Sequence, residues 1–255
     1  MKHYFLIMIC LVTGSGCAPS YRNNPHLPAA SLSDVNSSGE AAFDEFEKEL
    51  SQNQVTVPDP LESLNRAMYG VNDVLYFWVV KPVSHLYKGV VPKPVRIGIG
   101  NFFYNVTTPA RFVNCLLQDK YPAAGRELHR FVVNTTVGVL GFGDPAHDRW
   151  GLEPAEEDLG QTLAVYGFGD GCYVVWPLLG PSTLRDSVGM VGDQFLNPVR
   201  YVEPAEASIG ISAASAINKS SFHIGEYEAF KSAAVEPYVA MREAYLQYRS
   251  KQIKE

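Results

Sequence analysis

The chain has 255 residues and a formal net charge of −6, and its basic side chains form no stripe along the sequence. This mildly acidic balance argues against a nucleic-acid partner. With 46% hydrophobic and 12% aromatic residues, the chain has enough apolar material for one domain with a sizeable core.

The N-terminus has the layout of a bacterial secretory signal. A basic start at Lys2 precedes an apolar run, Phe5 to Val12, and small residues then lead to Cys17. The run is too short to span a bilayer as a mature helix. A cysteine directly after small residues predicts a lipoprotein signal over 1–16 and acylation at Cys17, although a plain secretory signal with an incidental cysteine has the same layout. Because Ala18 follows the cysteine, we expect a lipid anchor at the periplasmic face of the outer membrane.

The segment that follows differs in composition from the rest of the chain. Residues 17–57 are rich in Pro, Asn, Ser and Ala, and we expect a lipidated, largely disordered tether. Its acidic part, Glu40 to Leu50, is a candidate surface helix. Nearly all large apolar side chains come later, which predicts one helical domain over 58–252.

A helix is expected from about Pro60. Its apolar residues recur at three- and four-residue steps: Leu61, Leu64, Met68, Val71, Leu75 and Trp78. The stretch from Val74 to Val80 reads VLYFWVV and is apolar on all sides, so it must be buried in protein or in lipid. Pro82 is then expected to kink or end the helix.

Prolines delimit the next predicted elements. Helices are expected at 84–90, 94–104, 107–118 and 121–136. Pro92, Pro94, Pro109 and Pro122 separate them. Short helices bounded by prolines favour a curved, irregular bundle over long parallel rods.

Glycine and aromatic residues dominate 137–180. Within this region LAVYGF and CYVVWPLL flank the turn Gly169 to Gly171, which predicts one β-hairpin in an otherwise helical domain. Thr183 and Asp186 have the spacing of a capping box that opens a helix.

The last predicted elements are helical. A helix of small residues is expected near 205–217, and a helical region over 221–252 is broken at Pro237. In the second half of that region four side chains line one face: Tyr238, Met241, Tyr245 and Tyr248.

Signals for catalysis are missing from the sequence. There is no GxSxG elbow, no metal-ligand spacing and no phosphate loop, so we predict no catalytic residue, no metal and no cofactor. The two Gly-Phe-Gly pieces, at 141–143 and 167–169, read as turns. The run from Glu153 to Asp158 reads as a solvated charge run that starts a helix, and His85 and His129 as core histidines with partners.

Two pairs of residues leave alternatives open. Arg66 and Arg185 lie on helices rich in apolar side chains, where each makes either a salt bridge or a phosphate contact. Cys115 and Cys172 either pair in an oxidising compartment or remain free thiols.

A physical problem emerges from these features together. The domain is expected at a membrane and contains segments that are apolar on all sides, yet it has no run of 18 apolar residues that would span a bilayer. Such helices lie within one leaflet or surround an amphiphilic passage. That combination suits a protein that handles lipids.

Three segments resemble the VacJ/MlaA family of outer-membrane lipoproteins, in the same order: DPLESLNRAMYGVND from Asp59, GPSTLRD from Gly180, and EPYVAMREAYLQYR from Glu236. The resemblance implies a mainly α, ring-shaped helical domain with one short β-hairpin and an amphipathic central channel, lying in the inner leaflet. It implies removal of misplaced glycerophospholipids from the outer leaflet, without hydrolysis, and their transfer to a soluble periplasmic carrier for retrograde intermembrane transport. This maintains lipid asymmetry, often beside a trimeric outer-membrane porin.

Carried over to this chain, the resemblance makes the block from Asp59 to Asp73 an early ring helix and places VLYFWVV against acyl chains. The candidates for the lipid channel or its gate are Arg66, Tyr69, Asn72, Gly169, Gly171, Thr183, Arg185 and Asp186. The alternative is an envelope lipoprotein that binds partners or acts as a virulence factor without lipid transfer. An enzyme acting on lipids is disfavoured because no nucleophile motif is present.

Overall fold

A computed structural model describes residues 57–254. The predicted signal over 1–16, the predicted acylation site Cys17 and the candidate helix Glu40 to Leu50 lie outside these residues. The described part is mainly helical and contains one two-stranded antiparallel sheet, which confirms the predicted fold class.

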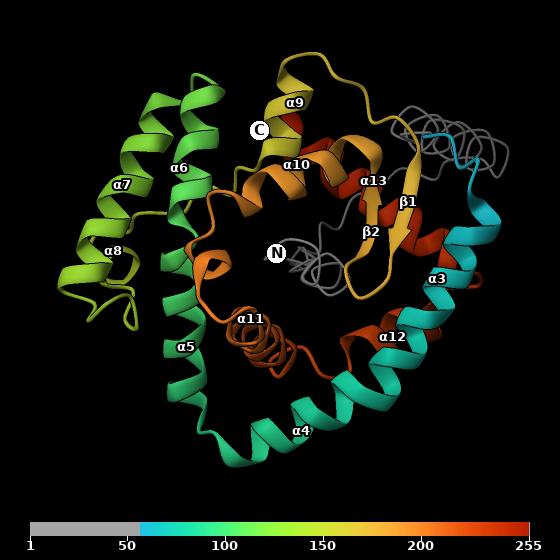
Figure 1. Cartoon of the computed structure of the whole chain (residues 1–255), viewed down its shortest axis with the longest axis horizontal. Coiled ribbons are helices and arrows are strands. Elements are labelled where there is room, and N and C mark those ends of the chain that lie inside the picture. Colours follow the sequence, from blue (N-terminus) through green and yellow to red (C-terminus); the bar gives the residue numbers. More distant parts are fainter. Residues whose placement is uncertain (1–56, 255) are drawn as a thin grey trace, which may run out of the picture.

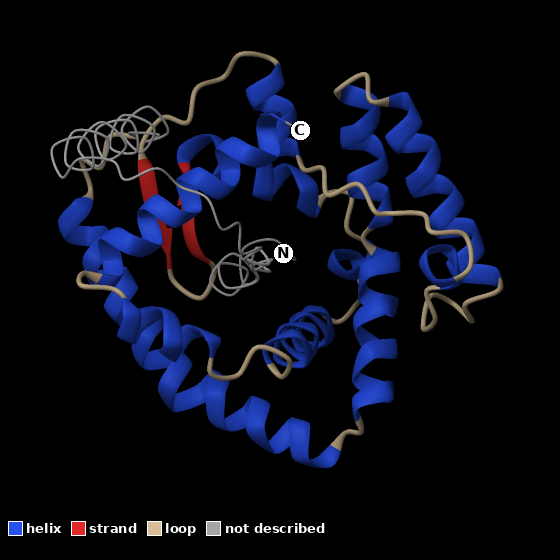
Figure 2. Cartoon of the chain, turned by 180° about the vertical axis from the view of Figure 1, so that it is seen from behind, coloured by secondary structure: helices blue, strands red, loops and turns tan. Residues whose placement is uncertain are grey.

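The elements follow a closed circuit when the molecule is viewed down its shortest axis from either side (Figures 1 and 2). The first half of the circuit consists of α3 (Glu62–Leu75), the π-helical turn η2 (Tyr76–Val80), α4 (Lys81–Val90), α5 (Lys93–Val106) and α6 (Thr108–Leu117). α7 (Tyr121–Thr136) packs antiparallel on α6, and with α8 (Pro145–Asp148) it lies on the outer side of the circuit (Figure 1). These bounds confirm the predicted helices between 84 and 136.

Pro82 does not end the first helix, contrary to one of the two outcomes expected for it. The chain stays helical through η2 and α4 as far as Val90. The wide π-turn lies directly before the proline, where the missing N–H and the ring would otherwise interrupt an α-helix. Pro94, Pro109 and Pro122 each lie in the first turn of a helix, where no hydrogen bond is lost.

The β-hairpin exists, but only one of its two predicted strands is right: CYVVWPLL contains a strand, whereas LAVYGF does not. LAVYGF ends a helix, α9 (Leu159–Val165), and the strands are β1 (Tyr173–Trp176) and β2 (Gly180–Thr183). Tyr173 pairs with Thr183 and Trp176 with Gly180, so the turn lies at 177–179. Gly169 to Gly171 therefore forms the loop that enters β1. Asp158 caps α9 by accepting a hydrogen bond from the Gln161 amide, which is why this apolar segment is helical.

Four of the remaining helices were predicted: α10 (Leu184–Gln194), α11 (Ala205–Ser220), α12 (Glu226–Ala233) and α13 (Pro237–Lys254). The short 3₁₀ helix η3 (Pro198–Tyr201) was not. α11 is the predicted helix of small residues, and it lies inside the circuit, seen end-on in Figure 1. The break before α13 falls at Pro237 as predicted.

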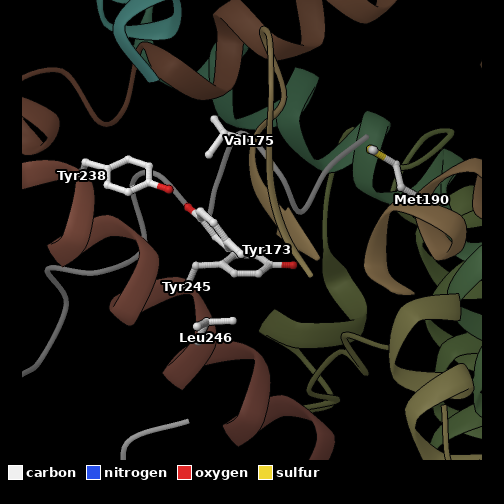
Figure 3. Close-up of a cluster of buried hydrophobic side chains, with 6 residues drawn as sticks. All are labelled: Tyr173, Val175, Met190, Tyr238, Tyr245 and Leu246. Carbon is white, nitrogen blue, oxygen red and sulfur yellow. The ribbon is translucent and has the colours of Figure 1, made fainter. Parts of the chain in front are cut away.

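The main apolar cluster joins β1 to α13 (Figure 3). Tyr173 and Val175 of β1 meet Tyr238, Tyr245 and Leu246 of α13. Tyr238 and Tyr245 belong to the predicted face of the last helix, and Tyr248 of that face packs against the cluster. The hairpin is thus packed against the C-terminal helix on one side and, as shown below, against α3 on the other.

Polar side chains fill more of the interior than apolar ones. Within residues 57–254, 24 polar or charged residues are buried against 14 apolar ones, while 34 large apolar residues are exposed. Trp78 of the VLYFWVV segment is 80% exposed, whereas Tyr76 of the same segment is buried. Exposed apolar surface of this extent marks a surface that contacts protein or membrane instead of water.

Several expectations about single residues are wrong. His85 and His129 are exposed instead of being core histidines. Of the charge run from Glu153 to Asp158, Asp158 is buried, although Glu153 is solvated as expected. For Cys115 and Cys172 the free-thiol alternative is confirmed, although only Cys115 is fully buried.

Candidate functional site

Two asparagines on α3 hold the hairpin in place. Asn65 is fully buried, accepts a hydrogen bond from the Val175 amide at 2.8 Å and donates to the Tyr173 carbonyl at 3.0 Å. Two turns later Asn72 donates to the Trp176 carbonyl at 2.9 Å and accepts from the Leu178 amide at 2.7 Å. β2 pairs with only one edge of β1, and the other edge has backbone N–H and C=O groups that need partners. Each asparagine side chain of α3 bonds one N–H and one C=O group of β1 or of the turn that follows it, as a third strand would.

The hairpin turn is exposed and apolar. Leu178 has a left-handed backbone, with φ of 64°, and its side chain is exposed. Trp176 donates from its indole to the Ser187 hydroxyl of α10 at 2.8 Å. Asn72 of α3 therefore holds the turn and Ser187 of α10 holds Trp176 at its base, while the Leu178 side chain in the turn stays exposed.

Arg66 and Tyr69 face the C-terminal helices instead of the hairpin. Arg66 bridges Glu62 and Glu236, and its guanidinium lies over the Tyr238 ring at 4.5 Å. Tyr69 accepts a hydrogen bond from the Tyr227 hydroxyl of α12 at 3.2 Å. For Arg66 the structure confirms the salt-bridge interpretation.

The start of α10 forms the second group. The Thr183 hydroxyl accepts from the Asp186 amide at 3.1 Å, which confirms the predicted cap. Gly171 has a φ of 72°, and a Cβ there would lie 2.9 Å from Leu184, so glycine is required. Gly169 has open space around it, so nothing in its surroundings requires glycine.

A buried ion network lies beneath this group. Arg249 of α13 is 2% exposed and grips two carboxylates, with bonds of 2.7 and 3.0 Å to Asp158 and of 3.0 and 2.9 Å to Asp186. Tyr245 donates to Asp186 as well. Burial by itself would raise the pKa of Asp186, but the charges of Arg249 and Arg185 and the bonds from Arg249 and Tyr245 outweigh it and hold that pKa below its ordinary value.

Arg185 extends the network to the loop before β1. Its Nη2 lies 2.7 Å from Asp170 and 3.1 Å from Asp186. The salt-bridge interpretation is therefore confirmed for Arg185 too. The network ties together α9, α10, α13 and the loop that enters the hairpin.

The pKa of one nearby carboxyl, Asp193, is raised instead of lowered. Asp193 at the end of α10 accepts from Asn114 of α6 at 2.7 Å and from the Leu159 amide at 3.1 Å. Burial raises the pKa of Asp193 to about 6, and the negative charge of Asp158 adds to the shift.

The predicted site residues thus divide into two groups that the hairpin connects. Asn72 reaches the hairpin turn, Gly171 lies in the loop that enters it, and Thr183, Arg185 and Asp186 lie where it runs into α10. The sequence analysis missed Asn65, Asp158 and Arg249. The seven-residue spacing of Asn65 and Asn72 was a usable signal, since it places both amides on one helix face.

Neither a metal site nor a membrane span is found in the described part of the chain. No cluster of three or more His, Cys, Asp or Glu side chains there is suited to an ion. None of the helices within 57–254 combines the length and the apolar character needed to cross a bilayer.

Comparison with known proteins places the chain in a family. A sequence model of the MlaA lipoprotein family matches residues 57–252, and the chain belongs to this family. It is similar to the intermembrane phospholipid transport system lipoprotein MlaA of Escherichia coli K12, with 36% identity over 196 residues, or 74% of this chain and 76% of that protein. An uncharacterised protein of Rickettsia felis is 33% identical over 189 residues, 74% of this chain and 75% of the relative.

A solved structure supports the same assignment. It comes from work on the structural basis for maintenance of bacterial outer membrane lipid asymmetry. The match has a TM-score of 0.68 at 32% identity and covers 77% of this chain and 99% of the other.

Proposed function

We propose that this chain is an outer-membrane lipoprotein that removes misplaced glycerophospholipids from the outer leaflet and passes them to a soluble periplasmic carrier. This retrograde transfer maintains lipid asymmetry, and no bond of the lipid is broken. Family membership supports the proposal, because the Escherichia coli relative is named as a lipoprotein of an intermembrane phospholipid transport system.

The observation that carries the proposal is the inverted distribution of polar and apolar side chains. An apolar exterior over 57–254 suits immersion in acyl chains, and the buried polar side chains hold the helices together through ion pairs such as Arg249 with Asp158. We place the domain in the inner leaflet, held by the acylated Cys17. The circuit then surrounds an amphipathic channel, and a trimeric porin packs on part of the apolar exterior.

The hairpin is the proposed gate of this channel. Its turn is held to α3 through Asn72, while the apolar side chain of Leu178 in the turn stays exposed. A cross-link between Asn72→Cys and Leu178→Cys, made in a Cys172→Ser background, should stop lipid passage and release it on reduction. The single Asn72→Cys variant is the control, and transfer that the cross-link leaves unchanged would contradict a gating role.

The main test is the phospholipid content of the outer leaflet in a strain that lacks the gene. We expect this content to rise and a plasmid copy to restore it. A strain with unchanged outer-leaflet phospholipid would contradict the transport proposal and favour a lipoprotein that only binds partners.

A further inference from the structure

Five arginines are buried in the described part of the chain, and four of them face a carboxylate. The four pairs have N–O distances of 2.7 Å: Arg111 with Glu127, Arg130 with Asp144, Arg185 with Asp170, and Arg249 with Asp158. The fifth, Arg96 of α5, is 5% exposed and has no ion pair within 57–254. A buried charge without an opposite charge is costly, so this exception needs an explanation.

Arg96 is held firmly by only one of its nitrogens. Its Nη1 donates to the Ser221 carbonyl at 3.2 Å and to the Ser221 hydroxyl at 2.8 Å. The Phe222 ring lies 4.6 Å from its Cζ and covers one flat face. Ser221 ends α11, and the partial negative charge of that helix end offsets only part of the guanidinium charge.

The Nε edge of the same guanidinium is left without an acceptor, since Nε of Arg96 is buried and has no hydrogen-bond partner. In Arg249 the corresponding edge is filled, because Nε and Nη2 bind the two oxygens of Asp186 at 3.0 and 2.9 Å. In Arg111 the Nε donates to a carboxylate at 2.7 Å. This fork of two N–H groups matches the spacing of two oxygens on a carboxylate or a phosphate.

Further unpaired donors lie on the helices that surround Arg96. Ser84 of α4 is fully buried and Ser220 of α11 nearly so, and neither hydroxyl has a partner. Ser84 lies one turn before Tyr87, which donates to Asn218 of α11, and Asn218 donates to the Arg96 carbonyl. Nε of Arg130 is also buried without a partner, but Arg130 has an ion pair with Asp144, so the missing counter-charge is what distinguishes Arg96.

We infer that Arg96 binds a phosphate oxyanion with its Nε edge, at the junction of α4, α5 and α11. This inference deepens and rests on the proposed function, since it assigns the site to the phosphodiester of a glycerophospholipid. α11 lies inside the circuit whose wall includes α4 and α5, so the junction belongs to the inner side of that wall (Figure 1). Free inorganic phosphate shares this chemistry and is the other source.

The test compares ligands that differ only in the phosphate. Full-length protein in detergent micelles is titrated with dioleoylphosphatidylglycerol, with dioleoylglycerol, which lacks the phosphate, and with inorganic phosphate. We expect Arg96→Gln to weaken binding of phosphatidylglycerol by about tenfold or more, because a charged hydrogen-bond pair is lost. Binding of dioleoylglycerol should not change. Arg126→Gln is the control, since Arg126 is an exposed arginine on α7.

Arg96→Lys keeps the charge but loses the fork, and we expect an intermediate loss. This variant decides the matter if far-UV circular dichroism shows that Arg96→Gln does not fold. A loss confined to phosphatidylglycerol assigns the site to the lipid headgroup, and a loss confined to inorganic phosphate assigns it to the free ion.

Unchanged binding of both phosphate-containing probes by both variants overturns the inference. An equal loss for dioleoylglycerol does so as well, because it would show an effect on acyl-chain binding or folding. Failure of the proposed function looks different: the wild-type protein would bind neither lipid, whatever the effect of Arg96 on inorganic phosphate.

Discussion

Replacing Arg249 with glutamine is expected to destabilise the domain more than any change of an exposed charge. Arg249→Gln removes the cation that Asp158 and Asp186 share in the interior. Glutamine fills part of the space but carries no charge and offers fewer donors. The two carboxylates then remain buried without the positive charge that Arg249 supplies.

The magnitude follows from the burial and the number of bonds. The Arg249 side chain is 2% exposed and makes four hydrogen bonds to the two carboxylates, at distances between 2.7 and 3.0 Å. Removing one partner of such a buried pair costs roughly 3–5 kcal/mol of unfolding free energy. For a domain of this size that corresponds to a fall in Tm of about 6–20 °C.

The effect should depend on pH with a defined sign. In the wild type the pKa of Asp186 lies below its ordinary value, so its contribution to stability is complete at neutral pH and is lost as the pH falls through the lowered pKa. In the variant much of the cationic influence is gone, and burial favours the protonated carboxyl. The gap in Tm between wild type and variant should therefore narrow between pH 7 and pH 5.

Thermal unfolding of the full chain in detergent, followed by far-UV circular dichroism at both pH values, measures this gap. Arg126→Gln on α7 is the control. Arg126 is exposed, and an exposed charge contributes little to stability. A loss below about 1 kcal/mol for Arg249→Gln, or a gap independent of pH, would refute the reasoning about the buried network.

Four further outcomes are expected. Asn65→Ala should cost about 3 kcal/mol in urea unfolding, because β1 loses the two bonds that Asn65 makes to it, and an unchanged midpoint would contradict the clamp. Gly189→Ala should cost about 2 kcal/mol, since a Cβ there lies 2.3 Å from the backbone of α9, whereas Gly210→Ala, with open space, should cost nothing. Because the pKa of Asp193 is raised to about 6, wild-type stability should fall as the pH rises through 6. The Tm of Asp193→Asn minus the Tm of the wild type should therefore increase between pH 5 and pH 8. Cys17→Ser should abolish fatty-acid labelling and release the protein from the membrane pellet; continued acylation would show that the predicted cleavage site is wrong.

Local signals in the sequence were sufficient for most helices. Prolines at 94, 109, 122 and 237 lie in first turns, where their fixed φ and missing N–H do no harm, so their positions predict the helix starts. The Thr183 cap was also predictable from local sequence, because its hydroxyl oxygen and the amide of Asp186 lie three residues apart and meet within one turn.

The hairpin shows where local signals end. It was predicted one segment too early, because an apolar run such as LAVYGF has no feature that distinguishes a buried strand from a buried helix. The Asp158 cap and the close packing of α9 against α10 at Gly160 and Gly189 decide for the helix. The edge of β1 is then completed by asparagine side chains from α3, which no propensity predicts.

The sequence by itself determined the order of the helices, the mainly α class and the family to which the chain belongs. Only the tertiary structure decided which faces are buried. Apolar periodicity is the same whether a helix face meets a protein core or an acyl chain, so the exposed Leu64 and Trp78 were indistinguishable from core residues. Arg249 meets Asp186 and Asp158 across 63 and 91 positions, and contacts of that range leave no period in a sequence because they depend on the closure of the whole fold.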